Sequence, residues 1–391
     1  MRAEERRRAI VEAVRGGASL RATARCFGVG LGTVQRWVGR AGEDRLDRVD
    51  WSDRPDRPHR TTRTDPASER LVLDTRRQLR ETSILGEYGA RAIHAVLRDR
   101  PELRGQVPSV RTIGRILKRA GMLDRRRTAT PTPPPGWYLP DVREWEAELD
   151  SFDTIEGLAL RDGGRLTVLT GVSLHGGLVD AWPERSITVE RVIRSLLERW
   201  RLAGLPGYAQ FDNDGRFVGS TSTEDAIGLV IRACLAVRVT PVFAPPHESG
   251  FQAAIESFNG LWQAKVWNRY HDLPLDELRE RSSRYVLASR LRRAPRADAA
   301  PARRWFEAEA VDLDAPPTGR LVYLRRTSDR GSATVLGHHF QVERHWPHRL
   351  VRAEVDLDFG RIRFFALRRR APSDQPLLRE VTYSPPARWV R

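Results

Sequence analysis

The sequence predicts a multidomain protein with N-terminal all-α helix-turn-helix units, a central α/β core and a C-terminal small all-β barrel. Its 391 residues exceed the roughly 100–200 residues of one ordinary domain. Apolar spacing is helical at first, then alternates between strand and helix periods, and ends in short strands. The formal net charge of +16 is segregated: residues 1–127 carry +13, residues 317–391 carry +8, and the residues between them carry −5.

This charge pattern predicts a nucleic-acid partner. Lys118 and Lys265 are the only lysines among 67 basic residues, and the planar arginine fork suits phosphate and base-edge contacts. A high-GC genome would explain the ratio of arginine to lysine, but not the segregation of charge. Basic ends around an acidic middle favour double-stranded DNA as the partner, with a carboxylate site between the two DNA contacts.

Composition excludes several other classes. Hydrophobic residues make up 40% of the chain, including 11 Trp, so a globally disordered chain is excluded. Cys26 and Cys234 offer neither a disulfide framework nor a paired-cysteine zinc site. No apolar run approaches the roughly 18–20 residues of a membrane span, and the opening residues lack a secretory leader. We therefore expect a cytoplasmic, nucleoid-associated protein with no membrane partner.

Residues 1–49 predict a helix-turn-helix. Apolar residues at helical spacing, a Ser19 cap and a Gly-Val-Gly turn at 28–30 mark three helices, the third from about Gly32 to Arg40. On the third helix, the residues free to face a DNA major groove are Thr33, Gln35, Arg36 and Arg40. The alternative is a small helical bundle without a DNA role.

A second helix-turn-helix or winged-helix-like unit is expected at 65–127, after a polar linker at 50–64. Its third helix starts after the N-cap Ser109 and buries an apolar stripe that includes Ile113 and Leu117. The outward residues expected to contact DNA are Arg111, Thr112, Arg115, Lys118 and Arg119. The alternative is a spacer of the same shape that does not bind DNA.

A Pro-rich linker at 128–140 precedes a predicted α/β core at 141–300. The elements expected are strands at Glu148–Ile155, Arg165–Leu174 and Gly177–Trp182, a helix over Val189–Trp200, a strand at Tyr208–Phe211, a helix near Asp225–Val237, a strand at Val239–Phe243, and a helix from about Gln252. The order β-β-β-α-β-α-β-α is typical of an RNase H-like sheet.

Acidic residues fall where such a sheet could assemble a metal site. Asp212 directly follows a strand, and Glu256 lies on the helix from Gln252. A third carboxylate must come from the first strand, where Asp150 and Asp153 point to opposite faces. Carboxylate oxygens suit Mg²⁺, and two ions about 3.5–4 Å apart can act on both the attacking and the leaving oxygen.

These segments resemble a known family. DNDGRF, starting at Asp212, resembles the D-N-G-x-x-F segment of integrase-core (DDE, RNase H-like) insertion-sequence transposases, which are related to retroviral integrases. QAAIESFN is similar to their N-A-x-x-E-S-F signature and gives Glu256 the glutamate position of the triad, and SLHGGLVDAW resembles the segment after their second strand. The resemblance covers essentially the whole chain and favours Asp153 over Asp150 as the first acid.

The resemblance implies a DDE transposase, that is, a polynucleotidyl transferase. Asp153, Asp212 and Glu256 would hold two Mg²⁺ ions, or Mn²⁺ in their place, for cleavage at transposon ends and transfer of the 3′-hydroxyl into target DNA. The helix-turn-helix units would bind terminal inverted repeats, and the chain would act as a homo-oligomer on DNA. The alternatives are a catalytically inactive DNA-binding protein or transcriptional regulator derived from a transposase, and an RNase H-like nuclease without joining activity.

The chain departs from the family pattern at three places. Glu248 stands at the usual shorter distance after Asp212, but in the turn-like PPHESG. Asp214 replaces the usual glycine, either as a further oxygen ligand or as a solvated loop residue. Lys265 follows Glu256 by nine residues, where the family has a basic residue after seven, which leaves its predicted DNA contact open.

After a connector at 301–316, the residues 317–391 predict five short strands: GRLVYLRR, GSATVLG, HHFQVER, HRLVRAEVD and GRIRFFALRR. This density of strands suggests a small SH3-like barrel. Its net charge of +8 favours contact with the DNA backbone.

Overall fold

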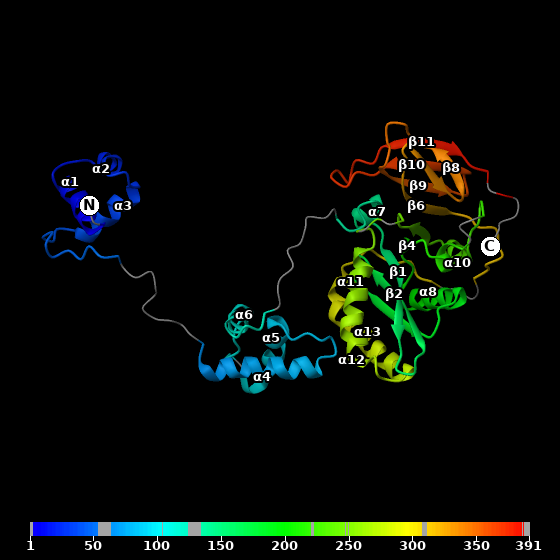
Figure 1. Cartoon of the computed structure of the whole chain (residues 1–391), viewed down its shortest axis with the longest axis horizontal. Helices are drawn as coiled ribbons and strands as arrows, with labels where there is room; N and C mark the ends of the chain where they lie inside the picture. Colours follow the sequence, from blue (N-terminus) through cyan, green and yellow to red (C-terminus); the bar gives the residue numbers. More distant parts are fainter. Residues whose placement is uncertain are drawn as a thin grey trace. The chain divides into compact units, whose positions relative to one another are not determined.

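The computed structural model describes residues 3–53, 64–103, 105–123, 134–219, 223–246, 248, 250–306, 311–384 and 386 (Figure 1). The chain divides into two compact units, Met1–Pro66 and Ala67–Arg391. Most of the first expected linker, 54–63, lies outside the described residues, and so does the segment 124–133, which holds the end of the second expected helical unit and the first half of the Pro-rich linker. Within those residues, no helix combines the length and the apolar character that crossing a membrane requires.

The first unit contains the three predicted helices, α1 (Ala3–Arg15), α2 (Leu20–Cys26) and α3 (Leu31–Ala41). Ser19 caps α2 by accepting a hydrogen bond from the Ala22 backbone N–H at 3.2 Å. Gly28 makes the turn before α3 with φ of +58°, a conformation that favours glycine. The Trp37 ring packs against Trp51, with ring centroids 6.1 Å apart, so the segment after α3 is part of this unit.

The second unit begins with three more helices, α4 (Pro66–Thr82), α5 (Ala90–Arg98) and α6 (Val110–Arg119). Their own small core is made of Val72, Ile93, Leu97, Ile113, Ile116 and Leu117. Ser109 caps α6 through the Thr112 backbone N–H at 3.2 Å, as its position predicts. The three helices belong to the same compact unit as the α/β core that follows them.

A mixed sheet of nine strands is the centre of the second unit. Its strands are β1 (Leu149–Ala159), β2 (Arg165–Ser173), β3 (Val179–Glu184), β4 (Tyr208–Phe211), β5 (Thr240–Phe243), β6 (Arg320–Arg326), β9 (Leu350–Asp356), β10 (Arg361–Ala366) and β11 (Leu377–Thr382). They lie in the order β11-β10-β9-β6-β5-β4-β1-β2-β3. β1, β2 and β3 form an antiparallel meander, whereas β4 joins β1 in parallel and β5 joins β4 in parallel. This arrangement is the α/β sheet that the sequence predicts.

Helices cover both faces of the sheet. On one face, α8 (Val189–Ala203) and α10 (Leu229–Ala236) pack on a core that includes Phe152 and Leu169. On the other, α11 (Ala253–Trp262) and α13 (Leu275–Asp298) pack on residues of opposite parity in the same strands, including Val168. The sheet is therefore the middle layer of three. The short helices are α7 (Pro140–Arg143), α9 (Gly215–Val218) and α12 (Asn268–Tyr270), with a π-helical segment at Gln263–Trp267.

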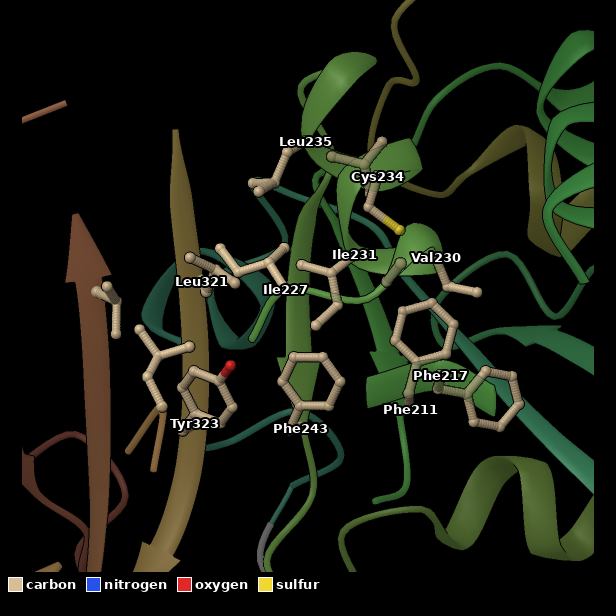
Figure 2. Packing of buried hydrophobic residues seen from close by; sticks show 14 of the residues in the cluster. Phe211, Phe217, Ile227, Val230, Ile231, Cys234, Leu235, Phe243, Leu321 and Tyr323 are labelled. Atoms are coloured by element: carbon tan, nitrogen blue, oxygen red, sulfur yellow. The ribbon is translucent and has the colours of Figure 1, made fainter. Parts of the chain in front are cut away.

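The expected separate SH3-like barrel is not confirmed, because the C-terminal strands extend the central sheet. β6 pairs in parallel with β5, with Val242 opposite Val322 and Phe243 opposite Tyr323. Figure 2 shows Phe211, Phe243 and Tyr323 side by side on three neighbouring strands. A strand at the edge of a sheet leaves backbone donors and acceptors unpaired, and β6 satisfies those of β5. Only β7 (Ser332–Val335) and β8 (His338–Gln341) form a separate hairpin within the described residues.

Candidate active site

Two of the predicted acidic residues lie side by side at neighbouring parallel strands. β1 and β4 pair as far as Ser151 and Gln210, whose side chains share a hydrogen bond of 3.1 Å. Asp153 comes two residues after Ser151, and Asp212 comes two residues after Gln210. Neighbouring strands lie about 4.8 Å apart, so Asp212 follows the end of β4 directly beside Asp153.

Asp150 lies on the opposite face of β1, as the alternation of side chains requires. It is fully buried and accepts hydrogen bonds from Arg199 Nε at 3.0 Å, Arg303 Nη2 at 2.5 Å and Ser173 Oγ at 2.8 Å. Burial alone would raise the pKa of the Asp150 carboxyl, but the two arginine charges overcome this effect and hold the pKa well below its usual range. The structure therefore places Asp150 in a buried ion pair under α8.

Glu256 approaches Asp153 from α11, on the other face of the sheet. Asn259, one turn after Glu256, donates a hydrogen bond from Nδ2 to Asp153 Oδ2 at 2.8 Å. Residues three apart on a helix are neighbours on its surface, so Glu256 lies on the part of α11 that faces Asp153. Its side chain is exposed, which leaves the carboxylate accessible from solvent.

Asn259 and Thr170 hold the Asp153 carboxylate in place, and sequence reasoning missed both of them. Thr170 lies opposite Asp153 in the pairing of β1 with β2. Its hydroxyl is 2.7 Å from Asn259 Oδ1 and 3.1 Å from the Asp153 carbonyl oxygen. The signal for Asn259 was present, since it closes the segment QAAIESFN three residues, or about one helical turn, after Glu256.

The environment of Asp153 shifts its pKa. Burial, together with the negative charges of Asp212 and Glu256, raises the pKa of Asp153 to about 6, although hydrogen bonds from Thr154 and Asn259 act in the opposite direction. Burial also raises the pKa of Asp212. Carboxylates that repel one another's charge in this way form a site that favours cations.

Asp214, which the sequence left open as an oxygen ligand or a solvated loop residue, caps α9 and pairs with Arg216. Its side chain accepts hydrogen bonds from the Arg216 backbone N–H at 2.8 Å and so caps α9. The same carboxylate binds the Arg216 guanidinium at two points, Nε at 2.8 Å and Nη2 at 2.6 Å. The Asp214 backbone N–H donates to Asp212 Oδ1 at 3.0 Å, so this turn also orients Asp212.

The donor chemistry of the site fits a hard divalent cation. Asp153, Asp212 and Glu256 offer carboxylate oxygens from three separate elements, and Mg²⁺ prefers oxygen ligands. In the described part of the chain, however, no group of three or more His, Cys, Asp or Glu side chains is arranged closely enough to hold a metal ion. Metal binding by these three residues is still a prediction.

Glu248, the alternative to Glu256, points to the C-terminal strands. It forms ion pairs with Arg326 and with Arg369, the latter at 3.2 Å. Only 16% of its side chain is exposed. These contacts use Glu248 to join the loop after β5 to the C-terminal part of the sheet.

Three of the residues predicted to contact DNA are engaged within the chain. Arg40 bonds to the Ser52 carbonyl and to Asp50, both at 2.8 Å. Arg119 pairs with Glu69, and Lys265 donates to the Gly86 carbonyl at 2.9 Å. The exposed residues of the predicted set are Gln35, Arg36, Arg111, Arg115, Lys118 and Arg119. Thr33 and Thr112 are half-buried.

Comparison with known proteins gave structural matches alone. No family model matches the chain, and no curated protein does. A simian T-cell lymphotropic virus intasome in complex with PP2A regulatory subunit B56 gamma is 16% identical, with 68% of this chain and 84% of that chain covered at a TM-score of 0.33. The HTLV-2 integrase catalytic core domain in complex with magnesium is 16% identical over 34% of this chain and 81% of that chain, at a TM-score of 0.26. The catalytic core domain of BIV integrase is 14% identical over 36% of this chain and 81% of that chain, at a TM-score of 0.28.

Proposed function

We propose that this chain is a DNA transposase of the DDE type, an integrase-like polynucleotidyl transferase related to those of insertion sequences. The observation that carries the proposal is the approach of Asp153, Asp212 and Glu256 from β1, the end of β4 and α11, which raises the pKa of Asp153 to about 6 through burial and mutual repulsion. The sequence segments around Asp212 and Glu256 support the same function. The reaction would be cleavage at transposon ends and transfer of the exposed 3′-hydroxyl into target DNA.

Three residues would bind the metal ions, and other groups orient their carboxylates. Asp153, Asp212 and Glu256 would hold Mg²⁺, or Mn²⁺ in its place, and such ions, when bound in pairs, activate the attacking oxygen and stabilise the leaving oxygen. Asn259 fixes Asp153 Oδ2 and the Asp214 backbone N–H fixes Asp212 Oδ1. Two of the three carboxylates are thus oriented before DNA arrives, which lowers the cost of assembling the reactive geometry.

DNA would be bound mainly by the helical units. The exposed Gln35 and Arg36 on α3, and Arg111, Arg115 and Lys118 on α6, lie on the third helix of each unit, which in helix-turn-helix proteins enters the major groove. We propose terminal inverted repeats and target DNA as the two substrates, and a homo-oligomer as the acting form, because two ends must be joined to one target.

The test uses the full chain with Mg²⁺, a plasmid target, and labelled duplexes taken from the DNA that flanks its coding sequence. The wild type should cut one duplex and join it to the plasmid, whereas Asp153→Asn, Asp212→Asn and Glu256→Gln should do neither. Asp162→Asn, which alters an exposed carboxylate in the β1–β2 turn, should stay fully active. Activity in the three variants would overturn the proposed site.

The two alternatives give different outcomes in the same assay. Cleavage without joined product would indicate a nuclease. Binding of the duplex with neither cleavage nor joining by the wild type would indicate a DNA-binding protein whose site is inactive.

A further inference from the structure

Arg216 lies beyond the end of β4, four residues after Asp212 of the candidate active site. β4 ends at Phe211, whereas its neighbour β1 continues to Ala159. Arg216 Nη2 crosses to β1, where it lies 2.6 Å from Glu156 Oε1 and 3.3 Å from Thr154 Oγ1. Thr154 and Glu156 alternate with Asp153 along β1, so Arg216 contacts β1 on the sheet face opposite to the one that carries Asp153. Its positive charge still acts on Asp212.

The guanidinium is held in one orientation. Asp214 binds it at two points, through Nε and Nη2, and paired contacts of this kind fix the plane of the arginine fork. Asp214 is itself fixed, because it caps α9 and only 29% of its side chain is exposed. Arg216 is therefore oriented by the protein before any ligand is bound.

Part of this fixed guanidinium makes no hydrogen bond to the residues that the structure describes. Nη1 has no hydrogen-bond partner among the described residues, although Nε and Nη2 each have at least one. Glu156, the outer partner of Nη2, has 58% of its side chain exposed and can turn away into solvent. Within the described part of the chain, Arg216 thus has two N–H donors on Nη1 without an acceptor and a third, on Nη2, whose acceptor it can exchange.

We propose that Arg216 is a DNA-backbone contact of the candidate active site, and that it grips a phosphate next to the reacting one while Asp214 acts as its positioning residue. A phosphate oxygen pair matches an oriented guanidinium better than it matches a flexible point charge. This inference rests on the proposed function for its substrate. It also gives Asp214 a purpose at the position where the resembled family has glycine.

The first measurement is the salt dependence of binding of the full chain to the flanking duplex. Loss of one phosphate contact lowers the slope of log affinity against log salt by about 1. We expect that decrease for Arg216→Gln and none for Arg185→Gln, which removes the same charge from an exposed ion pair with Asp162 in the β1–β2 region. An unchanged slope for Arg216→Gln would overturn the inference.

The second measurement locates the contact. Single backbone phosphates of the duplex are replaced one at a time by neutral methylphosphonate. At one position near the cleavage point, the replacement should weaken wild-type binding about tenfold and should have no further effect on Arg216→Gln. In Asp214→Asn the same replacement should matter less, because the arginine keeps its charge but loses its fixed orientation. A replacement profile that is identical in wild type and Arg216→Gln would contradict the contact.

Failure of this inference can be told apart from failure of the proposed function. A wild type that binds the duplex but neither cuts nor joins it overturns the proposed function, while the salt slope and the methylphosphonate profile still decide the phosphate contact. A wild type that cuts and joins, beside an Arg216→Gln variant with wild-type slope and activity, overturns the contact alone. Arg216→Lys keeps the positive charge but lacks the planar guanidinium with its paired donors. It serves as the second variant, which should fold even if Arg216→Gln does not. Its methylphosphonate profile should lose the single sensitive position.

Discussion

Asp150 and Asp153 show how the position of a residue in a strand decides its chemistry. They lie three residues apart, so one carboxylate faces α8 and the other faces α11. Asp150 is neutralised by Arg199 and Arg303, whereas Asp153 meets further carboxylates, which contribute to the rise in its pKa to about 6. The same residue type is a structural anchor on one face and a candidate ligand on the other.

Removing the Asp150 charge should destabilise the fold strongly. Asp150→Asn leaves Arg199, whose side chain is fully buried, without its main counter-charge, and breaking a buried ion pair costs about 3–5 kcal/mol. Asp162→Asn, which breaks an exposed pair with Arg185, should cost no more than about 1 kcal/mol. Urea unfolding of both variants measures the free energy of unfolding. Equal, small changes would show that the buried pair contributes nothing.

Protonation of Asp150 should lower the free energy of unfolding in acid. Its pKa is lower in the folded chain than in the unfolded chain, so the folded state binds fewer protons, and stability is present above about pH 4 and is lost as the pH falls below it. Wild-type urea midpoints at about pH 5, 4 and 3 should decrease more steeply than those of Asp150→Asn. Parallel decreases in the two proteins would assign acid unfolding to other carboxyls.

Sequence reasoning could name Asp153, Asp212 and Glu256 as candidates, because the positions of acids on the predicted elements and the resemblance of short segments carry that information, and their role as metal ligands stays a prediction. It could not find Arg216, whose contacts with β1 depend on β4 ending at Phe211 while β1 continues. It also read Asp214 in isolation, whereas the structure shows a cap and an ion pair at once. Local sequence patterns do not contain the contacts between residues that are distant in sequence.

At the scale of elements, local signals were reliable where one face of an element is buried. The apolar spacing over Val189–Trp200 predicted α8, and Tyr208–Phe211 was predicted with the exact bounds of β4. β11 was missed because Leu377–Thr382 is an outer strand whose residues are exposed or half-buried. Such a strand lacks the alternation that burial of one face imposes.

The N-cap of α6 gives a prediction at this scale. Ser109→Ala removes the acceptor of the Thr112 N–H and should cost about 1 kcal/mol. Hydrogen exchange of the α6 amides should become faster, while exchange in α8 stays unchanged. Ser109→Thr retains the hydroxyl and should restore slow exchange. Unchanged exchange in Ser109→Ala would mean that tertiary packing alone defines this end of the helix.

At the scale of the whole molecule, the C-terminal strands are part of the core. One hydrophobic cluster contains Phe211 and Phe243 from the α/β region together with Tyr323 and Phe364 from the C-terminal strands. The sequence suggested a separate barrel because its strands are short and closely spaced. It could not show that β6 pairs with β5, since that pairing joins residues about eighty positions apart.

This continuity predicts that the C-terminal region cannot be removed without damage to the candidate active site. A chain that ends at Pro316 loses every strand from β6 onward, which exposes the edge of β5 and the apolar side chains of Phe243 and its neighbours. We expect such a chain to bind a hydrophobic dye, to be cut rapidly by protease between β4 and α11, and to melt well below the full chain. The unit Met1–Pro66, which has its own core, should resist protease equally in both. Wild-type melting and no dye binding in the shortened chain would instead favour an independent C-terminal domain that merely rests against the sheet.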